Sequence, residues 1–441
     1  MEHKFIHDFT VAAQKAGIDH LNYYMETVER ASLEMVQREI RATEQSRTVN
    51  CFVQGEFQGN CGHYYTGDFD GTSIREGIES IKQISEVMED TFYPVEIAAY
   101  EKAETGTLSE QEDVKNRILH AENLVRAQFP DIRQFDCHYR EERKEIRLQN
   151  EAGDCMSDGS CHVSFTVGVE AEKNGIVQTA RVGNKASSGA KLDIPAMFME
   201  AAKEASELLD ASPAASGRYP VILKNSVMNE MLGMFIATFG ADMVHRKLSK
   251  YNGKIGEKVA SSLVNLVEEP WLPEGIRNRR FDDEGVPTSR KEIIKDGILM
   301  TYLYNKEEAG KDKCMSTGNG FKSDYKNKAE IHVTNLKLIG EEKTRDALIR
   351  QMKDGLYIVS CDGMFAGADI VSGDFSLISK GYLIKNGKTE RAVNQITVAG
   401  NFFDMLGNIE GIANDYLIEG GDAGAYLVPS VYIAELVISG V

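Results

Sequence analysis

The sequence predicts an α+β fold of two domains, with large mixed or antiparallel sheets and flanking helices. Apolar residues recur at helical spacing in some segments and alternate with polar residues in others, so both kinds of element are expected. Asn-Gly and Asp-Gly pairs join several of the alternating segments, which favours tight hairpins over repeated βαβ units. The 441 residues exceed what one hydrophobic core usually organises, which indicates two domains.

Three helices are expected early in the chain. The first is short and covers residues 6–13, where Ile6, Phe9, Ala12 and Ala13 are apolar. The second runs from Ile74 to Met88, behind a cap at Thr72 or Ser73. The third opens with the capping box Ser109–Glu112 and continues through Val125.

Strands are expected between and after these helices. Leu21–Met25 and Val49–Val53 alternate, and the clearest strand is Val163–Val169. It continues into Asn174-Gly175, a strong hairpin signal. The following segment, Asp193–Leu209, predicts a helix with a proline in its first turn.

A small, polar, proline-containing stretch follows and predicts the domain boundary. We place the linker at about residues 211–218. Residues 1–210 then form an N-terminal α+β domain, and residues 219–441 form a C-terminal domain that is mostly β.

The second domain is expected to open with a strand, Val221–Leu223, and an apolar helix capped by Ser226. Tight turns at Asp296-Gly297 and Asn386-Gly387 predict two hairpins. Two more helices are expected, at Lys343–Lys353 and Phe402–Glu410.

Composition argues against several classes of partner. The 68 acidic and 50 basic residues give a net charge of −18, which disfavours binding to nucleic acid. The most apolar run, Met231–Ala241, is too short to span a membrane. No secretory signal is visible at the N-terminus, and the seven cysteines are an odd number, so we expect a cytoplasmic protein with reduced thiols.

Histidine and cysteine patterns do not predict a metal site. No histidine is followed by glutamate, so neither HExxH nor HExxxH occurs, and His3 and His7 read as surface residues. Three Cys/His neighbours could in principle hold a soft metal: Cys61/His63, Cys137/His138 and Cys161/His162. Their spacing fits no Cys-x-x-Cys knuckle, so we interpret these cysteines as structural.

Other catalytic motifs are absent too. The sequence contains no Gly-x-Ser-x-Gly and no phosphate-binding loop. Phe281–Gly285 is the densest group of carboxylates, and it could line a cleft or bind a hard cation. The alternative, which we favour from chemistry alone, is a glycine-terminated turn before a hairpin.

Four stretches of the second half carry a family resemblance. They are Ser261–Gly275, Arg280–Leu299, Ser316–Gly320 and Ile396–Asp415. With this order and spacing the chain resembles the TldD/PmbA family, the so-called modulators of DNA gyrase. The likeness covers about 180 residues closely and extends more weakly through the first half.

The resemblance implies the PmbA (TldE) branch of this family. TldD-like members carry HExxxH on the helix after the first strand of the C-terminal domain, and a cysteine near the C-terminus completes the zinc set. An ungapped match places Gly233, Met234 and Thr238 at the His, Glu and His positions. The last cysteine is Cys361, so the C-terminal ligand is missing as well. We therefore expect no catalytic residue and no metal in this chain.

The resemblance also implies a partner. A TldD-like subunit would supply zinc and cleavage in a heterodimer, and this chain would shape the cavity that holds an extended peptide. Asp282, Glu284 and Arg290 are our candidates for cleft or interface positions. The peptides handled and any homo-oligomer stay open.

Two other hypotheses remain at this point. The chain could be a protein-binding regulator without a proteolytic role, as the family's older name suggests. It could also be a self-sufficient hydrolase that uses its Cys/His neighbours, which bound zinc would support.

Overall fold

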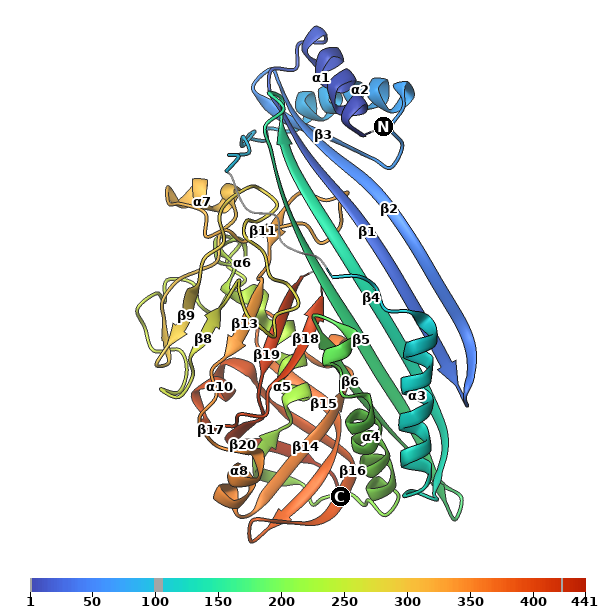
Figure 1. The fold of residues 1–441 in the computed structure, drawn as a ribbon. Helices are drawn as coiled ribbons and strands as arrows, with labels where there is room; N and C mark the ends of the chain where they lie inside the picture. The colour runs from blue at the N-terminus through green and yellow to red at the C-terminus, as the bar shows by residue number, and fades with distance from the viewer. Residues whose placement is uncertain (1, 99–105, 422) are drawn as a thin grey trace.

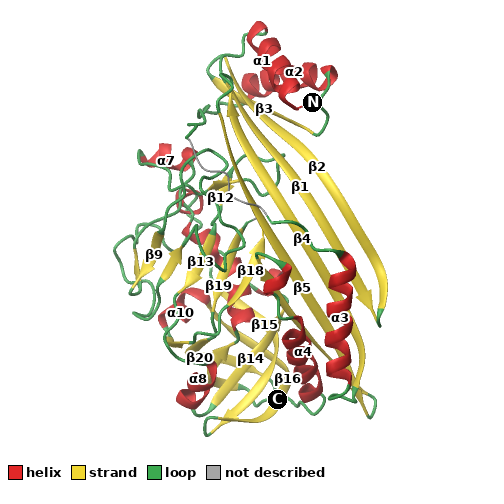
Figure 2. Ribbon diagram, in the orientation of Figure 1, coloured by secondary structure: helices red, strands yellow, loops and turns green. Residues whose placement is uncertain are grey.

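The chain folds into an elongated α+β structure, seen in a computed structural model that describes residues 2–98, 106–421 and 423–441 (Figure 1). Long strands dominate one side of the molecule, and shorter strands and helices gather on the other (Figure 2). The predicted fold class is confirmed. No described helix is long and apolar enough to cross a membrane.

The first sheet is antiparallel throughout, with strand order β3-β2-β1-β4-β5-β6. Its strands are β1 (Leu21–Val36), β2 (Glu39–Phe57), β3 (Asn60–Thr66), β4 (Ile132–Asn150), β5 (Cys155–Lys173) and β6 (Ile176–Ala186). Strands β2, β4 and β5 have 19 residues each. At about 3.3 Å per residue they reach roughly 60 Å. They therefore run along most of the molecule (Figure 1).

Helices cover this sheet at its two ends. Helices α1 (Glu2–Lys15) and α2 (Gly71–Val87) pack at one end, where Phe9 and Ile81 are fully buried. Helices α3 (Gln111–Arg126) and α4 (Ile194–Leu208) pack near the other end. There the ring of Phe198 packs against those of Phe135 and Phe165. The apolar faces predicted from helical spacing thus meet the sheet.

The second half of the chain forms two more six-stranded sheets. One has the order β10-β9-β8-β13-β19-β18. Its strands are β8 (Leu266–Glu268), β9 (Lys291–Lys295), β10 (Ile298–Leu299), β13 (Asn335–Leu338), β18 (Leu417–Gly421) and β19 (Gly424–Val428). A small pair, β11 (Gly320–Phe321) and β12 (Glu330–Ile331), lies outside them.

The other sheet has the order β16-β15-β14-β7-β20-β17. Its strands are β7 (Gly217–Leu223), β14 (Gly355–Asp362), β15 (Asp374–Lys385), β16 (Lys388–Asn401), β17 (Ile409–Ile412) and β20 (Val431–Ser439). Strand β16 also pairs with β20, which closes five of these strands into a ring. Each of the two sheets contains one parallel pair, β13 with β19 and β7 with β14, so both are mixed.

Helix α5 (Asn225–Phe235) packs its apolar face into the core of the second half. Phe235 stacks on Phe402 with ring centroids 4.3 Å apart. The shorter helices are α6 (Ala241–His245), α7 (Lys306–Asp312), α8 (Arg345–Met352), α9 (Met364–Gly367) and α10 (Phe402–Gly407), with 3-10 turns at Gly189–Lys191 and Ile236–Phe239. Residues distant in the sequence thus hold α5 in the core.

The predicted hairpin turns are confirmed. Asn174, Asp296 and Asn386 have φ values of 54°, 49° and 52°, and the glycine after each also has positive φ. Two successive positive φ values define the type I′ turn, which matches the twist of antiparallel strands. These turns could be predicted because their geometry depends on two residues only.

Two predicted caps in the first half are wrong. Asp70, not Thr72 or Ser73, caps α2, and its carboxylate accepts from the backbone N–H groups of both those residues. Helix α3 begins at Gln111 without a side-chain cap. Ser109 instead donates its hydroxyl to Glu141 on β4, so a tertiary contact replaces the local one.

Two predicted helix ends in the second half are also corrected. Helix α5 begins at Asn225, which places Ser226 inside the first turn rather than at the cap. The helix predicted over 402–410 ends at Gly407, because residues 409–412 pair with β20 as strand β17. Cross-strand pairing overrides the local helical signal there.

The segment between α4 and β7 contains no helix or strand. It is nevertheless packed against the second half of the chain. Arg391 donates to the carbonyls of Ser212 and Pro213. The side chain of Ala214 is only 1% exposed. The division at about residues 211–218 stays a prediction.

Candidate functional site

Helix α5 lines a cavity of about 460 Å³, which we call the α5 cavity. Strand β14 contributes residues 359–362, β18 contributes Glu419 and Gly420, and β6 contributes Arg181 and Gly183. The cavity therefore lies where the long first sheet meets the second half of the chain.

A second cavity of about 500 Å³ adjoins it along β6. The two share Arg181, Val359, Ser360 and Asp362 as lining residues. We call the two adjoining cavities the groove. Each cavity lies within the usual volume range of ligand pockets, so the groove can hold a small molecule or part of a peptide.

Asparagine side chains fix α5 beside the groove. Asn225 donates to the Asp415 carbonyl at 2.7 Å. Asn229 donates to the carbonyls of Leu417 and Tyr426, at 2.9 and 3.2 Å. Its Oδ1 atom is buried and has no hydrogen-bond donor among the described residues. A buried amide oxygen without a donor is unusual and indicates a place where a ligand or water can donate.

The three positions that correspond to the zinc motif do not fit a zinc ion. Gly233 has no side chain, and a Cβ atom there would lie 3.3 Å from the Tyr426 ring. Met234 is half-buried against the core and offers only a thioether. Thr238 is fully buried, and its hydroxyl donates to the Phe235 carbonyl at 2.6 Å. The end of α5 and the 3-10 turn that follows it supply packing and not metal ligands.

Three carboxylates line the α5 cavity instead: Glu230 of α5, Asp362 of β14 and Glu419 of β18. Partial burial and the charges of Asp362 and Glu419 raise the pKa of Glu230. Burial also raises the pKa of Glu419, although Lys185 opposes this effect. The sequence alone does not reveal this group, because its members lie far apart in the chain.

The basic side chains in and beside the groove have direct partners other than the three carboxylates of the α5 cavity. Arg181 lies 3.5 Å from Asp136, and the Lys380 ammonium donates to the Thr179 carbonyl. Lys185 donates to the Gly420 carbonyl. The carboxylates of the α5 cavity are therefore not neutralised by direct ion pairs with these side chains.

Cys361 also lines the α5 cavity, but its chemistry is that of a protonated thiol. The side chain is buried, its Sγ lies 3.3 Å from the Ser379 hydroxyl, and burial raises its pKa to about 12. Nucleophilic cysteines require a lowered pKa. All seven cysteines are free of disulfides. Across the described residues, no three His, Cys, Asp or Glu side chains are placed to hold a metal ion.

Asp282 and Glu284, both predicted as cleft or interface positions, lie in a tight turn. The Asp282 carboxylate is fully buried and accepts from the backbone N–H groups of Glu284, Val286 and Gly320. Glu284 accepts from the Lys306 N–H at the start of α7. Burial raises the pKa of both carboxyls; the charge of Glu284 raises that of Asp282 further, and the charge of Asp283 raises that of Glu284. Their contacts fix the turn itself and tie it to β11 and to the start of α7.

This turn does face the first sheet. Phe281 is buried in one apolar cluster with Tyr24, Phe52 and Met156. Arg290, the third predicted residue, is exposed and pairs with Glu269 at 3.2 Å. Neither cavity of the groove is lined by Asp282, Glu284 or Arg290, so their assignment to a cleft or interface with another molecule stays a prediction.

A buried ionic cluster joins the same turn to the first sheet. Arg279 donates to Asp283 at 2.8 Å and lies 3.7 Å from Asp158 of β5. The Lys322 ammonium lies 3.3 Å from the centre of the Phe52 ring. Burial lowers the pKa of Lys322 to about 7, although Asp283 opposes the effect. No local sequence pattern reveals this cluster, because its partners are distant in the chain.

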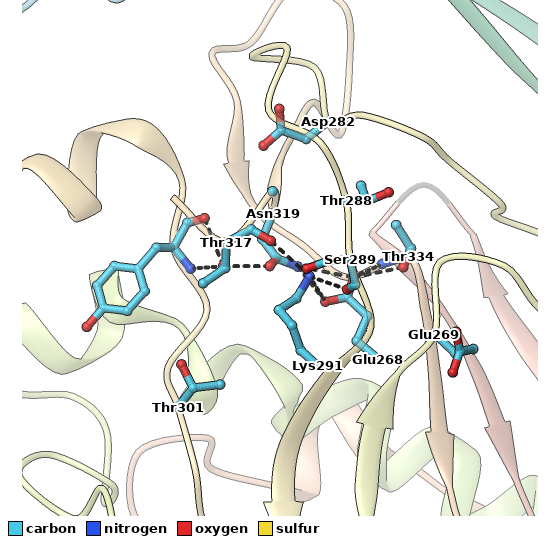
Figure 3. Close-up of polar contacts among 12 residues, drawn as sticks. Glu268, Glu269, Asp282, Thr288, Ser289, Lys291, Thr301, Thr317, Asn319 and Thr334 are labelled. Atoms are coloured by element: carbon cyan, nitrogen blue, oxygen red, sulfur yellow. Dashed lines mark hydrogen bonds and ion pairs between the residues drawn. The ribbon is translucent and has the colours of Figure 1, made fainter. Parts of the chain in front are cut away.

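A second buried network surrounds Glu268 (Figure 3). Its carboxylate accepts from the Asn319 amide, the Lys291 ammonium and both the N–H and the hydroxyl of Thr334. In Figure 3, Lys291 and Asn319 point toward Glu268, and Asp282 lies apart from them. This network ties together three of the sequence stretches that carry the family resemblance.

Comparisons with known proteins agree with this fold. A family model described as the PmbA/TldA metallopeptidase C-terminal domain matches residues 216–440. Metalloprotease PmbA of Escherichia coli O157:H7 is 27% identical, over 78% of this chain and 72% of that protein. A metalloprotease TldD homolog of Haemophilus influenzae is 26% identical, over 82% of this chain and 78% of that protein.

Solved structures extend the likeness to the whole chain. A candidate modulator of a DNA gyrase from Thermotoga maritima has a TM-score of 0.89, with 26% identity and full coverage of both chains. TldE from Thermococcus kodakarensis has a TM-score of 0.87, covering 99% of this chain and 100% of that one. Its 15% identity makes it evidence for the fold alone.

Proposed function

The chain belongs to the PmbA/TldD metallopeptidase family, and we propose that it is a non-catalytic partner subunit of a TldD-type zinc metalloprotease. In this proposal a TldD-like protein supplies the zinc ion, the general base and the cleavage step. This chain contributes the groove, which holds an unfolded or extended peptide.

The observation that carries the proposal is a cavity lined by a helix that lacks zinc ligands. Helix α5 lines a cavity large enough for part of a peptide, yet Gly233 and Met234 on this helix and Thr238 in the next 3-10 turn offer no zinc ligand. Cleavage of a peptide bond by zinc needs a cage of protein ligands and an open position for water. A chain that retains the cavity without the cage is suited to binding rather than to catalysis.

The strand edges around the groove support the binding of an extended peptide. Strand β6 ends the first sheet and β18 ends another, and each pairs with one strand only among the described residues. Both edges contribute lining residues to the α5 cavity. A peptide that adds to a strand edge is held by main-chain hydrogen bonds with little sequence requirement.

The test is reconstitution with a zinc-bearing TldD-like protein. The two chains are expected to form a stable complex by size-exclusion chromatography, and only the complex should cleave an unstructured peptide. As a control, a partner whose HExxxH glutamate is changed to glutamine should still bind this chain but should not cleave. Full activity of the partner without this chain would contradict the proposal, as would cleavage by this chain alone.

A second candidate function is favoured by the likeness to the Thermotoga maritima protein described as a modulator of a DNA gyrase. In that case the chain binds a protein target and takes no part in proteolysis. Affinity capture from a cytosolic extract separates the two: recovery of gyrase subunits without a metalloprotease favours regulation. The same preparations show by their size whether the lone chain forms homo-oligomers.

We also place the protein in the cytoplasm as part of this proposal. Seven cysteines without a disulfide are typical of a reducing compartment. Fractionation of cells that express the tagged chain tests the assignment.

A further inference from the structure

We propose that the groove selects peptides that carry lysine or arginine side chains, and that Glu230, Asp362 and Glu419 receive the cationic group. This inference rests on the proposed function, because it assigns a substrate class to the peptide-binding groove.

The three carboxylates converge on the α5 cavity from three separate elements. Glu230 and Asp362 keep much solvent-accessible surface although the cavity partly covers Glu230, and Glu419 is half-buried, so a ligand in the cavity can reach all three. Within the described part of the chain, no ion pair joins any of the three to a basic side chain. Lys185 acts on Glu419 only from beyond ion-pair distance, so the three carboxylates are available to an incoming cation.

Repulsion among the three carboxylates makes the binding of a cation favourable, because the cation reduces that repulsion. Burial and the neighbouring carboxylates raise the pKa of Glu230, and burial raises that of Glu419. Both shifts mean that the charged forms cost free energy in the empty cavity. A lysine ammonium or an arginine guanidinium would offset this cost, and a peptide carboxylate would increase it.

A second feature of the same cavity indicates a hydrogen-bonding ligand. Asn229 is 1% exposed, and its Nδ2 group donates both of its hydrogen bonds to backbone carbonyl oxygens. This arrangement fixes the orientation of the amide and leaves Oδ1 without a donor among the described residues. An N–H group of a bound peptide, or a water molecule held between the peptide and Asn229, would supply the missing hydrogen-bond donor.

The charge balance along the whole groove points the same way. Its acidic lining residues are Asp136, Glu170, Glu204, Glu230, Asp362 and Glu419, and its basic ones are Arg181 and Lys380. Only part of the acidic charge is neutralised: Arg181 pairs with Asp136, and Lys224 pairs with Glu204. A metal ion is a poorer occupant, because the described side chains include no group arranged to ligate one.

The test is a binding comparison of three labelled, unstructured peptides. The peptides share one Gly/Ser/Leu framework and differ only in having Lys, Gln or Glu at two central positions. Fluorescence anisotropy with the full-length chain, and with its complex, should show about tenfold tighter binding of the Lys peptide than of the Gln peptide. The Glu peptide should bind most weakly, and added salt should reduce these differences.

Variants of the chain locate the effect. The triple variant Glu230→Gln, Asp362→Asn and Glu419→Gln should bind all three peptides with similar affinity. A matched control changes three exposed carboxylates outside the groove: Glu86→Gln, Glu89→Gln and Glu342→Gln. That control should keep the preference. If the first triple variant unfolds, the single exposed change Glu230→Gln gives the same test with a smaller effect.

The outcomes separate this inference from the proposed function. Equal binding of the three peptides by the unchanged protein would overturn the charge preference and leave peptide binding intact. Equal loss of the preference in both triple variants would also overturn it, because the effect would not then depend on the carboxylates of the groove. Failure of every peptide to bind, to the chain and to the complex, would overturn both.

Discussion

The ring of Tyr426 packs against the backbone of α5 at Gly233, where an added Cβ atom would come within 3.3 Å of Cε2. The ring thus takes up space that a larger residue at position 233 would need. Its own backbone carbonyl accepts from Asn229 one turn earlier on the helix. The packing of α5 against β19, and not only the residue types, therefore disfavours a histidine at position 233.

The first prediction concerns an attempt to restore the zinc motif. The triple variant Gly233→His, Met234→Glu and Thr238→His should not bind zinc stoichiometrically, because the first imidazole meets the Tyr426 ring and the third replaces a fully buried threonine. Overpacking of this kind costs about 1–3 kcal/mol per site. Metal content by mass spectrometry and a thermal melt measure the two effects. Gly233→Ala serves as the control and should shift the melting temperature little, because the gain in helix propensity offsets the tight 3.3 Å contact of its Cβ atom with the Tyr426 ring.

A zinc-loaded, stable triple variant would mean that the Tyr426 ring moves aside easily. The geometry at Gly233 would then be a consequence of the missing histidine and would not prevent its return.

The second prediction concerns the buried network around Glu268. Glu268→Ala removes the carboxylate that accepts from Asn319, Thr334 and Lys291, and Lys291 is itself largely buried. Removing one partner of a buried pair costs about 3–5 kcal/mol of unfolding free energy. Chemical denaturation followed by fluorescence measures the change.

Glu269→Ala is the matched control for that variant. Glu269 pairs with the exposed Arg290 at 3.2 Å, a contact open to solvent. Such pairs contribute less than about 1 kcal/mol. Equal losses in the two variants would contradict the structural role of the Glu268 network.

The structure shows why this network and the groove could not be predicted from the sequence. Turns such as Asn174-Gly175 and the faces of α2 and α5 depend on neighbouring residues, and they could be identified directly. Glu230, Asp362 and Glu419 come together only through tertiary folding, and each alone is an ordinary surface acid. No local pattern distinguishes them.

The length of the first sheet also exceeded the prediction, for a different reason. The expected strand Leu21–Met25 is part of β1, which has 16 residues. Its middle, Glu26–Arg30, and the strands beside it are rich in charged residues, so apolar alternation is weak there. Cross-strand ion pairs contribute instead, including Arg30 with Glu142 at 2.6 Å and Lys144 with Glu26 at 3.1 Å. Such pairs depend on register, which local hydrophobic patterns do not reveal.

The third prediction concerns the pH dependence of stability at Lys322. Burial lowers the pKa of Lys322 in the folded protein to about 7, from an ordinary 10.5. Between these two values the unfolded chain binds the proton more than the folded chain does, so stability should rise with pH across this window. Lys322→Met should remove that rise, and denaturation midpoints between pH 7 and pH 10 measure it.

Lys250→Met is the control, because Lys250 is exposed. It should leave the pH profile as it is in the unchanged protein. An unaltered profile in Lys322→Met would show that the ammonium stays charged beside Asp283 throughout this range.

The fourth prediction tests the groove by filling it. Gly183 lies on β6 and lines the α5 cavity, and an added Cβ atom there meets its nearest neighbours, Glu419 and Thr166, at 3.4 Å, an ordinary contact distance. Gly183→Phe should therefore fold, since strands accept aromatic residues well, but its ring would occupy space that a peptide needs. In the reconstituted complex KM should rise by about tenfold, with little change in complex formation.

Val177→Phe is the matched change on the same strand, at an exposed position that lines neither cavity. It adds a ring to β6 without narrowing the groove, so peptide cleavage should continue at the normal rate. If Gly183→Phe cleaves as well as Val177→Phe does, the peptide does not pass along β6. The role of this chain would then lie in supporting its partner rather than in holding the substrate, because a filled groove that leaves KM unchanged cannot be the place where substrate binds.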